Sequence, residues 1–153
     1  MRMNRAWIEA RIPHRGRMCL LDEVVAWNAH HIRCSTGTHR ALDNPMRAHD
    51  RLGIACGVEY AAQAMALHGA LTAGASGATA SAAARVGLLA SVREMRLNAL
   101  RLDDIESDLL CEVAYVAGDG LTALYEFNLR CQGNLLLSGR ASVVLDAGGW
   151  LRL

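Results

Sequence analysis

Residues 51–72 constrain the fold most, because they read as a helix whose side chains are apolar or small on almost every face. Between Gly53 and Leu67, only Glu59 and Gln63 interrupt that surface, and their four-residue spacing puts both on one side of the helix. A helix that is apolar all round is normally buried, and burying an unpaired carboxylate costs several kcal/mol. The sequence therefore predicts a buried central helix, with Glu59 either paired with a neighbour or kept for acid–base chemistry.

Segments with strand character lie on both sides of this helix. Two precede it, at residues 18–28 and 30–38, joined by a tight turn near Asn28–Ala29, and four follow it, at 86–97, 108–118, 121–132 and 134–146. Residues 118–120 and 132–134 are the hairpin turns that separate the last three of these strands. A strongly twisted antiparallel sheet can enclose a helix that is apolar on all sides. We therefore predict an α+β hot-dog fold, with six antiparallel strands wrapped around one long helix.

The remaining segments are short. Residues 5–11 predict a short helix, and residues 39–50 predict a loop. Residues 73–85 lack large side chains and predict a mobile connection. With 153 residues the chain is long enough for one core, so we expect a single domain over residues 1–153.

Composition narrows the cellular setting and the class of partner. The chain is 52% hydrophobic, has no long uncharged apolar run, and begins with a charged segment, so we expect a cytoplasmic protein without a signal peptide or membrane helix. Its five cysteines form no CxxC pair, which predicts reduced thiols and neither a metal site nor a disulfide framework. Residues 1–51 hold nine arginines against five carboxylates, which could attract an anionic partner. No nucleic-acid module is recognisable, so we expect no nucleic-acid partner.

Two motifs carry a family resemblance. Residues 12–15 (IPHR) and 18–24 (MCLLDEV) resemble the LPHRxPFLLVDRV opening of the FabZ-type 3-hydroxyacyl-[acyl-carrier-protein] dehydratases. Residues 59–64 (EYAAQA) resemble the EAMAQA helix motif of the same enzymes, whose acidic residue is catalytic. The pattern HRxxDNPxR followed by GVEYAAQAMALHGAL looks most like the dehydratase-like subunits of aryl-polyene-type polyketide pathways.

The resemblance implies a mechanism but also shows a departure from it. In the family, a histidine in a GHFPG segment and the helix carboxylic acid divide the acid–base work of removing water from a 3-hydroxyacyl thioester. The N-terminus of the helix points backbone N–H groups at the thioester carbonyl. No GHFPG segment is present here, and the corresponding loop offers His39 and His49 instead. We therefore predict Glu59 and His39 as the catalytic residues.

Other candidate residues follow from the same alignment of motifs. Asn44, Gln63, His49 and Gly53 are predicted to bind substrate, with Asn44 holding the hydroxyl or the thioester and Gln63 orienting Glu59. Four of the candidates also have an ordinary structural explanation: His39 and His49 as solvated loop residues, Gln63 as a satisfied core amide, and Gly53 through packing. His14 and His68 are expected to be structural.

Three functions are compatible with these residues. The first is an active (3R)-hydroxyacyl-carrier-protein dehydratase that works as a dimer through a sheet edge, on a substrate held by the phosphopantetheine of an acyl carrier protein. The second is a catalytically weakened subunit that forms a heterodimer with a FabZ-like dehydratase. The third is a hot-dog thioesterase in which Glu59 activates water. None of the three requires a cofactor or a metal of its own.

Overall fold

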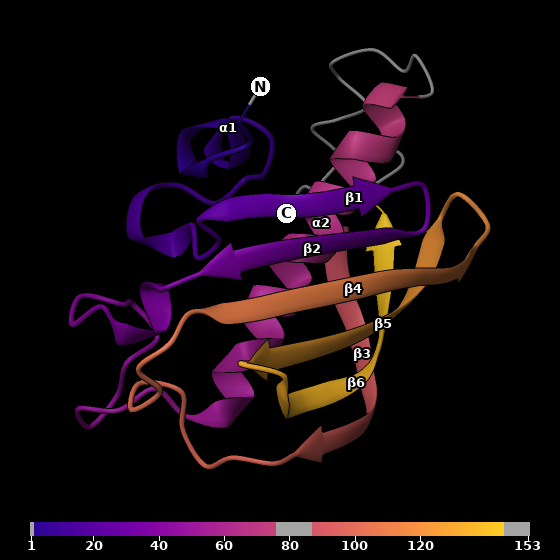
Figure 1. Cartoon of the computed structure of the whole chain (residues 1–153). Helices are drawn as coiled ribbons and strands as arrows, with labels where there is room; N and C mark the ends of the chain where they lie inside the picture. Colours follow the sequence, from indigo (N-terminus) through magenta and orange to yellow (C-terminus); the bar gives the residue numbers. More distant parts are fainter. Residues whose placement is uncertain (1, 76–86, 146–153) are drawn as a thin grey trace, which may run out of the picture.

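The computed structural model describes residues 2–75 and 87–145 (Figure 1). Its helices are α1 (Arg5–Glu9) and α2 (Gly57–Ala75), and short 3-10 turns lie at Gly16–Met18, Thr38–Arg40 and Ile54–Cys56. Its strands are β1 (Glu23–Asn28), β2 (His31–Thr36), β3 (Gly87–Leu97), β4 (Leu109–Gly118), β5 (Thr122–Cys131) and β6 (Asn134–Leu145).

The six strands form one antiparallel sheet in the order β1-β2-β4-β5-β6-β3. The sheet curves around α2, which confirms the predicted hot-dog fold (Figure 1). The β5–β6 connection shows how local sequence sets this order. Gln132 and Gly133 both have positive φ, at 49° and 82°, which is the geometry of a two-residue turn that matches the twist of a hairpin.

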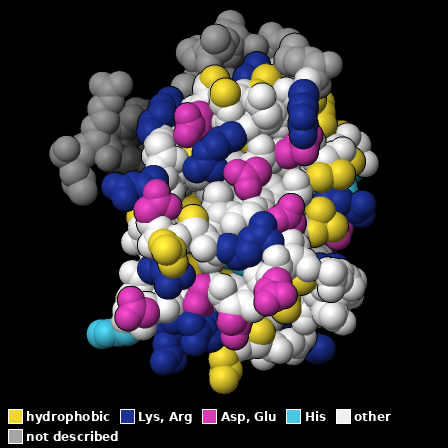
Figure 2. All heavy atoms as spheres, turned by 60° about the vertical axis from the view of Figure 1, so that its left-hand side comes forward, with side chains coloured by type: hydrophobic (Ala, Val, Ile, Leu, Met, Phe, Trp, Pro, Cys, Tyr) yellow, Lys and Arg dark blue, Asp and Glu magenta, His cyan; other side chains and the backbone are white. Residues whose placement is uncertain are grey.

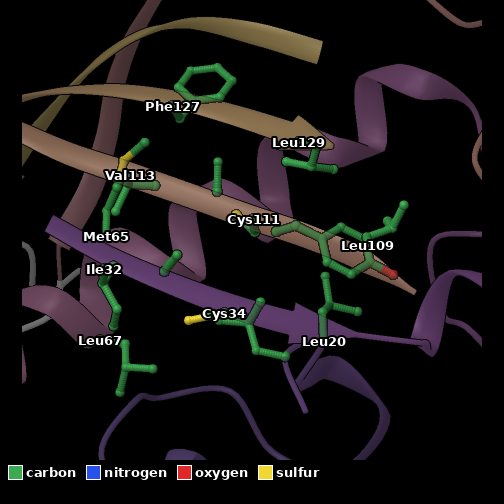
Figure 3. Close-up of a cluster of buried hydrophobic side chains, with 14 of the residues drawn as sticks. Leu20, Ile32, Cys34, Met65, Leu67, Leu109, Cys111, Val113, Phe127 and Leu129 are labelled. Carbon is green, nitrogen blue, oxygen red and sulfur yellow. The ribbon is translucent and has the colours of Figure 1, made fainter. Parts of the chain in front are cut away.

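The core lies between α2 and the concave face of the sheet, as Figure 3 shows. Met65 and Leu67 of α2 are buried with side chains that alternate along β2, β4 and β5. These strand residues are Ile32, Cys34, Leu109, Cys111, Val113, Phe127 and Leu129. Burial removes roughly 25 cal/mol of unfavourable hydration per Å² of apolar surface, so this layer supplies the main driving force that holds the helix inside the sheet.

The central helix begins later than predicted. Residues 54–56 form a 3-10 turn, and α2 starts at Gly57 rather than at residue 51. Close packing accounts for the glycine at this position: a Cβ there would lie 2.6 Å from Leu137 Cδ2. At the other end α2 continues to Ala75, so the predicted mobile connection is wrong for residues 73–75. Residues 76–86, the rest of that prediction, lie outside the described residues.

The first strand also begins later than predicted, at Glu23 instead of residue 18. The physical reason is that the backbone of Leu20 bonds to side chains rather than to a neighbouring strand. Its N–H donates to Gln63 Oε1 at 2.9 Å, and its carbonyl accepts from the Thr36 and Thr38 hydroxyls, the latter at 2.7 Å. Residues 19–22 therefore run as an irregular segment against α2.

Two further features bear on the sequence predictions. All five cysteines are free, and Cys19, Cys34 and Cys111 are buried. His68 is buried on α2, with Nδ1 3.1 Å from the Tyr125 hydroxyl and Nε2 3.0 Å from the Asn28 carbonyl oxygen. Among the described residues, no helix is both long enough and apolar enough to cross a bilayer.

Candidate active site

Glu59 lies in the first turn of α2, and its side chain is 35% exposed. His14 is its closest charged or ionisable contact, with Nε2 3.2 Å from Glu59 Oε1. Gln63 Nε2 approaches the same oxygen at 3.4 Å. The pKa of Glu59 is lowered, chiefly by the hydrogen bond from His14, while burial opposes that shift and Gln63 adds to it. The site therefore pairs a carboxylate that is ionised near neutral pH with an imidazole, in a position that solvent reaches.

His14 reaches Glu59 because the chain between α1 and β1 folds back over the start of α2. Ile12 and Cys19 are buried on either side of this segment. Between them, Gly16 adopts a left-handed φ of 58°, which lets the backbone reverse at that point. His14 Nδ1 is buried and has no hydrogen-bond partner among the described residues. The imidazole thus presents only Nε2 to a protein group, the Glu59 carboxylate.

Gln63, which was predicted to orient Glu59, makes its shorter hydrogen bonds elsewhere. It is fully buried, and its side-chain amide bonds at both ends to the irregular segment before β1. Nε2 donates to the Met18 carbonyl at 2.7 Å, and Oε1 accepts from the Leu20 N–H at 2.9 Å. Both bonds are shorter than its 3.4 Å contact with Glu59. Gln63 therefore mainly fixes the N-terminal segment against α2.

The prediction that His39 approaches Glu59 is wrong for contacts within this chain. His39 is fully buried, with Nε2 2.9 Å from the Ile105 carbonyl oxygen. The neighbouring Arg40 donates to the Glu106 carbonyl and pairs with Asp108. This 3-10 turn therefore fastens the loop before α2 to the segment before β4. The sequence was interpreted with His14 as structural and His39 as catalytic, whereas the structure brings His14 and not His39 to Glu59.

Asn44 has no free polar group for substrate within this chain, contrary to its predicted role. It is buried, and its amide donates to the Thr38 carbonyl at 3.0 Å and to the Tyr60 hydroxyl at 3.2 Å. Its oxygen accepts from the Met46 N–H at 3.0 Å. These bonds hold the turn between β2 and α2. They account for an asparagine at this position without any role in binding a ligand.

His49 and Gly53, the other predicted binding residues, lie in the segment that leads into α2. His49 is exposed with a positive φ of 52°, in a turn closed by the bridge between Ala48 and Arg51. Gly53 precedes the 3-10 turn, and a Cβ there would meet nothing within 4 Å. The Cys56 N–H bonds the Gly53 carbonyl, and the Gly57 N–H is also engaged by the 3-10 turn. These two amides are therefore not free to bind a thioester carbonyl.

Because His39 and His68 are buried, we expect the folded protein to lose stability in acid. Burial is the main cause that lowers the pKa of each below its ordinary 6.5, with Arg40 and His31 adding to the effect and nearby carbonyls and Asp108 opposing it. Above pH 6.5 both folded and unfolded chains hold these rings neutral, so this stability is fully present. Below that value the unfolded chain binds protons that the folded chain excludes.

We therefore expect the free energy of unfolding to fall by up to about 1.4 kcal/mol per pH unit for each histidine. Urea unfolding measured between roughly pH 7 and pH 5 tests this expectation. The H68Q variant is the control, since its curve should show a shallower dependence on pH. Equal unfolding free energies across that range would contradict the assignment of these rings as buried and neutral.

A groove also lies on the other side of the sheet. It encloses about 790 Å³ and is lined by residues of β2, β3, β4, β5 and β6, but not by Glu59 or His14. Its charges are largely matched within it: Arg140 pairs with Glu94 at 3.4 Å and with Glu126 at 2.7 Å. The groove also holds His31, whose Nε2 lies 3.6 Å from Glu112 Oε2, a longer contact than the 3.2 Å between His14 and Glu59. Arg33 shares the Glu112 carboxylate, also at 3.6 Å.

Charges of both signs are mixed on the molecular surface (Figure 2). Figure 2 shows basic and acidic side chains interspersed over the face that it presents, with isolated hydrophobic groups between them. Within the described part of this face, no single-signed basic surface of the kind that binds nucleic acid stands out. Nor do residues 2–75 and 87–145 contain a group of three or more His, Cys, Asp or Glu residues placed to hold a metal ion.

Among solved structures, the fold is shared with a dehydratase and with thioesterases. The dehydratase heterocomplex ApeI:P from Xenorhabdus doucetiae matches with a TM-score of 0.79 at 21% identity, covering 90% of both chains. A thioesterase from Haemophilus influenzae matches with a TM-score of 0.56 at 11% identity, covering 80% of this chain and 76% of that one. A hypothetical thioesterase from Streptococcus pneumoniae with coenzyme A has a TM-score of 0.56 at 11% identity, covering 80% and 84%.

Sequence comparison gives the family. No curated protein sequence matches the chain. The family model described as "ApeP-like: ApeP dehydratase" matches residues 6–147, which confirms the resemblance to aryl-polyene-type dehydratases drawn from the HRxxDNPxR pattern and the helix sequence after it. Since the match spans nearly the whole chain and includes both His14 and Glu59, the protein belongs to the ApeP-like family and is a dehydratase of hot-dog fold.

Proposed function

We propose that Glu59 and His14 are the acid–base pair with which this chain removes water from a 3-hydroxyacyl thioester. The substrate is held on the phosphopantetheine of an acyl carrier protein during cytoplasmic aryl polyene assembly. The contact of 3.2 Å between His14 Nε2 and Glu59 Oε1 carries the proposal. Dehydration needs one group to take a proton from C2 and another to give a proton to the departing hydroxyl, and these two side chains can meet both needs.

The hydrogen bond between the two side chains suggests their roles, because His14 donates through Nε2 and the Glu59 carboxylate accepts. Its carboxylate accepts the C2 proton, and the electron pair of that bond forms the C2–C3 double bond as the C3–O bond breaks. Protonated His14 gives its Nε2 proton to the departing hydroxyl, so that water and an enoyl thioester are the products. After this step Glu59 carries the proton taken from C2, and His14 has lost its Nε2 proton. Transfer from Glu59 back to His14 restores the starting state.

The edge of the sheet at β3 indicates how the chain assembles. β3 is 11 residues long and, within residues 2–75 and 87–145, pairs only with β6. Its Leu88, Leu89 and Leu97 are 45%, 40% and 53% exposed. The other edge, β1, is partly covered by the N-terminal segment, where the Val24 N–H bonds the Met3 carbonyl. A long unpaired edge with exposed leucines favours pairing with another sheet. We infer that β3 joins a second hot-dog subunit.

The partner that we propose is a FabZ-like dehydratase subunit rather than a second copy. The chain lacks the GHFPG histidine, and Asn44, in the loop where that histidine would lie, is engaged within the chain. One of the similar solved structures is the dehydratase heterocomplex ApeI:P, which supports the same arrangement. A partner that keeps its own histidine would give the assembly a second, different site.

Leu89→Asp should weaken this assembly. A carboxylate placed in an apolar subunit contact is left without a partner, which raises the dissociation constant about tenfold or more. Sedimentation velocity of the mixed subunits, at a series of concentrations, measures the change. L121D is the matched control, since Leu121 is 57% exposed outside the β3 edge and should leave assembly unchanged. Equal weakening by both variants would contradict β3 as the interface.

The products distinguish the proposed function from hydrolysis of the thioester. The purified chain, alone and mixed with a FabZ-like subunit, is offered a 3-hydroxyacyl carrier protein, and the carrier is followed by mass spectrometry. Loss of one water from the acyl group, with the acyl group still attached, supports dehydration. Release of the free 3-hydroxy acid would instead identify a thioesterase and overturn the proposal.

A further inference from the structure

We propose that Arg15 is a positioning residue whose guanidinium closes the turn that presents His14 to Glu59. Arg15 Nη1 lies 2.5 Å from the Glu9 carbonyl oxygen and 3.2 Å from that of His14, and it also contacts the Ile12 carbonyl. One cationic group thus gathers carbonyls from the end of α1 and from the residue that carries the imidazole. The inference about catalysis rests on the proposed function, whereas the positioning itself can be measured without activity.

The turn needs such a tether because it has little hydrophobic burial of its own. Ile12 and Cys19 are 2% and 0% exposed, whereas His14 is half-buried and residues 13 and 15–18 are exposed. Apolar packing therefore fixes the two ends of the segment and leaves its middle to polar bonds. Hydrogen bonds from a charged donor are stronger than neutral ones, and a guanidinium has a fixed geometry that suits several acceptors.

Two other bonds complete the frame around His14. Arg5 Nη2 donates to the Gly16 carbonyl at 3.2 Å, and Gln63 Nε2 donates to the Met18 carbonyl at 2.7 Å. These bonds hold the segment after His14, while Arg15 holds the segment before it. Arg15 is thus the described side chain that joins the His14 backbone to the end of α1, and losing it should free the imidazole to move away from Glu59.

Arg17 provides a matched control in the same turn. It is also an exposed arginine, but its guanidinium forms no hydrogen bond or ion pair with the rest of the described chain. R15Q and R17Q therefore remove the same charge from the same surface, and only R15Q removes the tether. R15K keeps the charge but offers an ammonium in place of the planar guanidinium, so it should retain part of the effect.

The titration of the Glu59 carboxyl, followed by carbon NMR on labelled protein, measures the positioning directly. The hydrogen bond from His14 is the main cause that lowers the pKa of Glu59 in the intact chain. In R15Q that pKa should rise, in the same direction as in H14Q, where the imidazole is gone. In R17Q it should stay at the wild-type value, and R15K should fall between. A role for Arg15 in stability alone would not move this titration.

Dehydration by the assembled subunits gives the second readout. Since a misplacement of about 1 Å can cost 10²-fold in rate, kcat of R15Q should fall about 10- to 100-fold while KM changes little. An unchanged Glu59 titration in folded R15Q overturns the proposal, and if R15Q fails to fold, an R15K titration identical to wild type does so. If the Glu59 titration shifts in R15Q but the wild-type assembly removes no water, Arg15 is still the positioning residue. That result would reject the proposed function instead.

Discussion

Glu59→Gln should lower the rate of water removal from a 3-hydroxyacyl carrier by about 10²-fold or more. The amide keeps the shape of the side chain but cannot accept the C2 proton. Because Glu59 is 35% exposed, the change should leave the fold intact. Single-turnover mass spectrometry of the acyl carrier measures the rate, and circular dichroism checks the fold.

E126Q is the control for this variant. Glu126 lies on the outer face of β5, where it pairs with Arg140 at 2.7 Å, and its side chain is 50% exposed, against 35% for Glu59. Exposed ion pairs contribute at most about 1 kcal/mol, so E126Q should dehydrate at the wild-type rate. A folded E59Q protein that retains the wild-type rate in the same assay would remove Glu59 from the mechanism.

His14→Gln should have the second-largest effect, again about 10²-fold, because glutamine cannot give a proton to the departing hydroxyl. His39→Gln should act differently. His39 is fully buried and bonds the Ile105 carbonyl, so the change should lower the free energy of unfolding by about 1–3 kcal/mol. Below its unfolding temperature, however, H39Q should keep kcat within a few-fold of wild type.

Comparing the two histidine variants separates chemistry from folding. Urea unfolding gives the stability of each variant, and single-turnover rates at low temperature give the chemistry of the folded fraction. If H39Q lost activity while H14Q kept it, the histidine predicted from the sequence would be catalytic after all, through a contact that only the assembled subunits provide.

Most of the fold could be predicted because its signals are local. A helix whose surface between Gly53 and Leu67 is interrupted only by Glu59 and Gln63 requires an enclosing sheet, and the alternation of buried residues along β4 and β5 identifies strands. The ends of the elements depended on distant contacts. The late start of β1 follows from Gln63 bonding the Leu20 backbone across the core, which the sequence around residue 20 does not indicate.

At the candidate site, too, local signals could be predicted from the sequence and distant contacts could not. Glu59 could be identified because a carboxylate on an apolar helix is costly and therefore conspicuous. His14 lay within a motif that was recognised, but its contact with Glu59 depends on the turn through Gly16. His39 was chosen because it is near the loop where a family histidine was missing. The carbonyl of Ile105, which determines its structural role, lies in a distant part of the chain.

The central claim is that this chain itself supplies the proton-transfer groups for dehydration. The most direct test pairs it with a FabZ-like subunit whose own catalytic histidine and acid have been replaced, and measures single-turnover loss of water from a 3-hydroxyacyl carrier. We predict dehydration when the wild-type chain is present, and a rate about 10²-fold lower when it carries E59Q. Equal rates with the wild-type and E59Q chains, in assemblies shown to form, would contradict the claim.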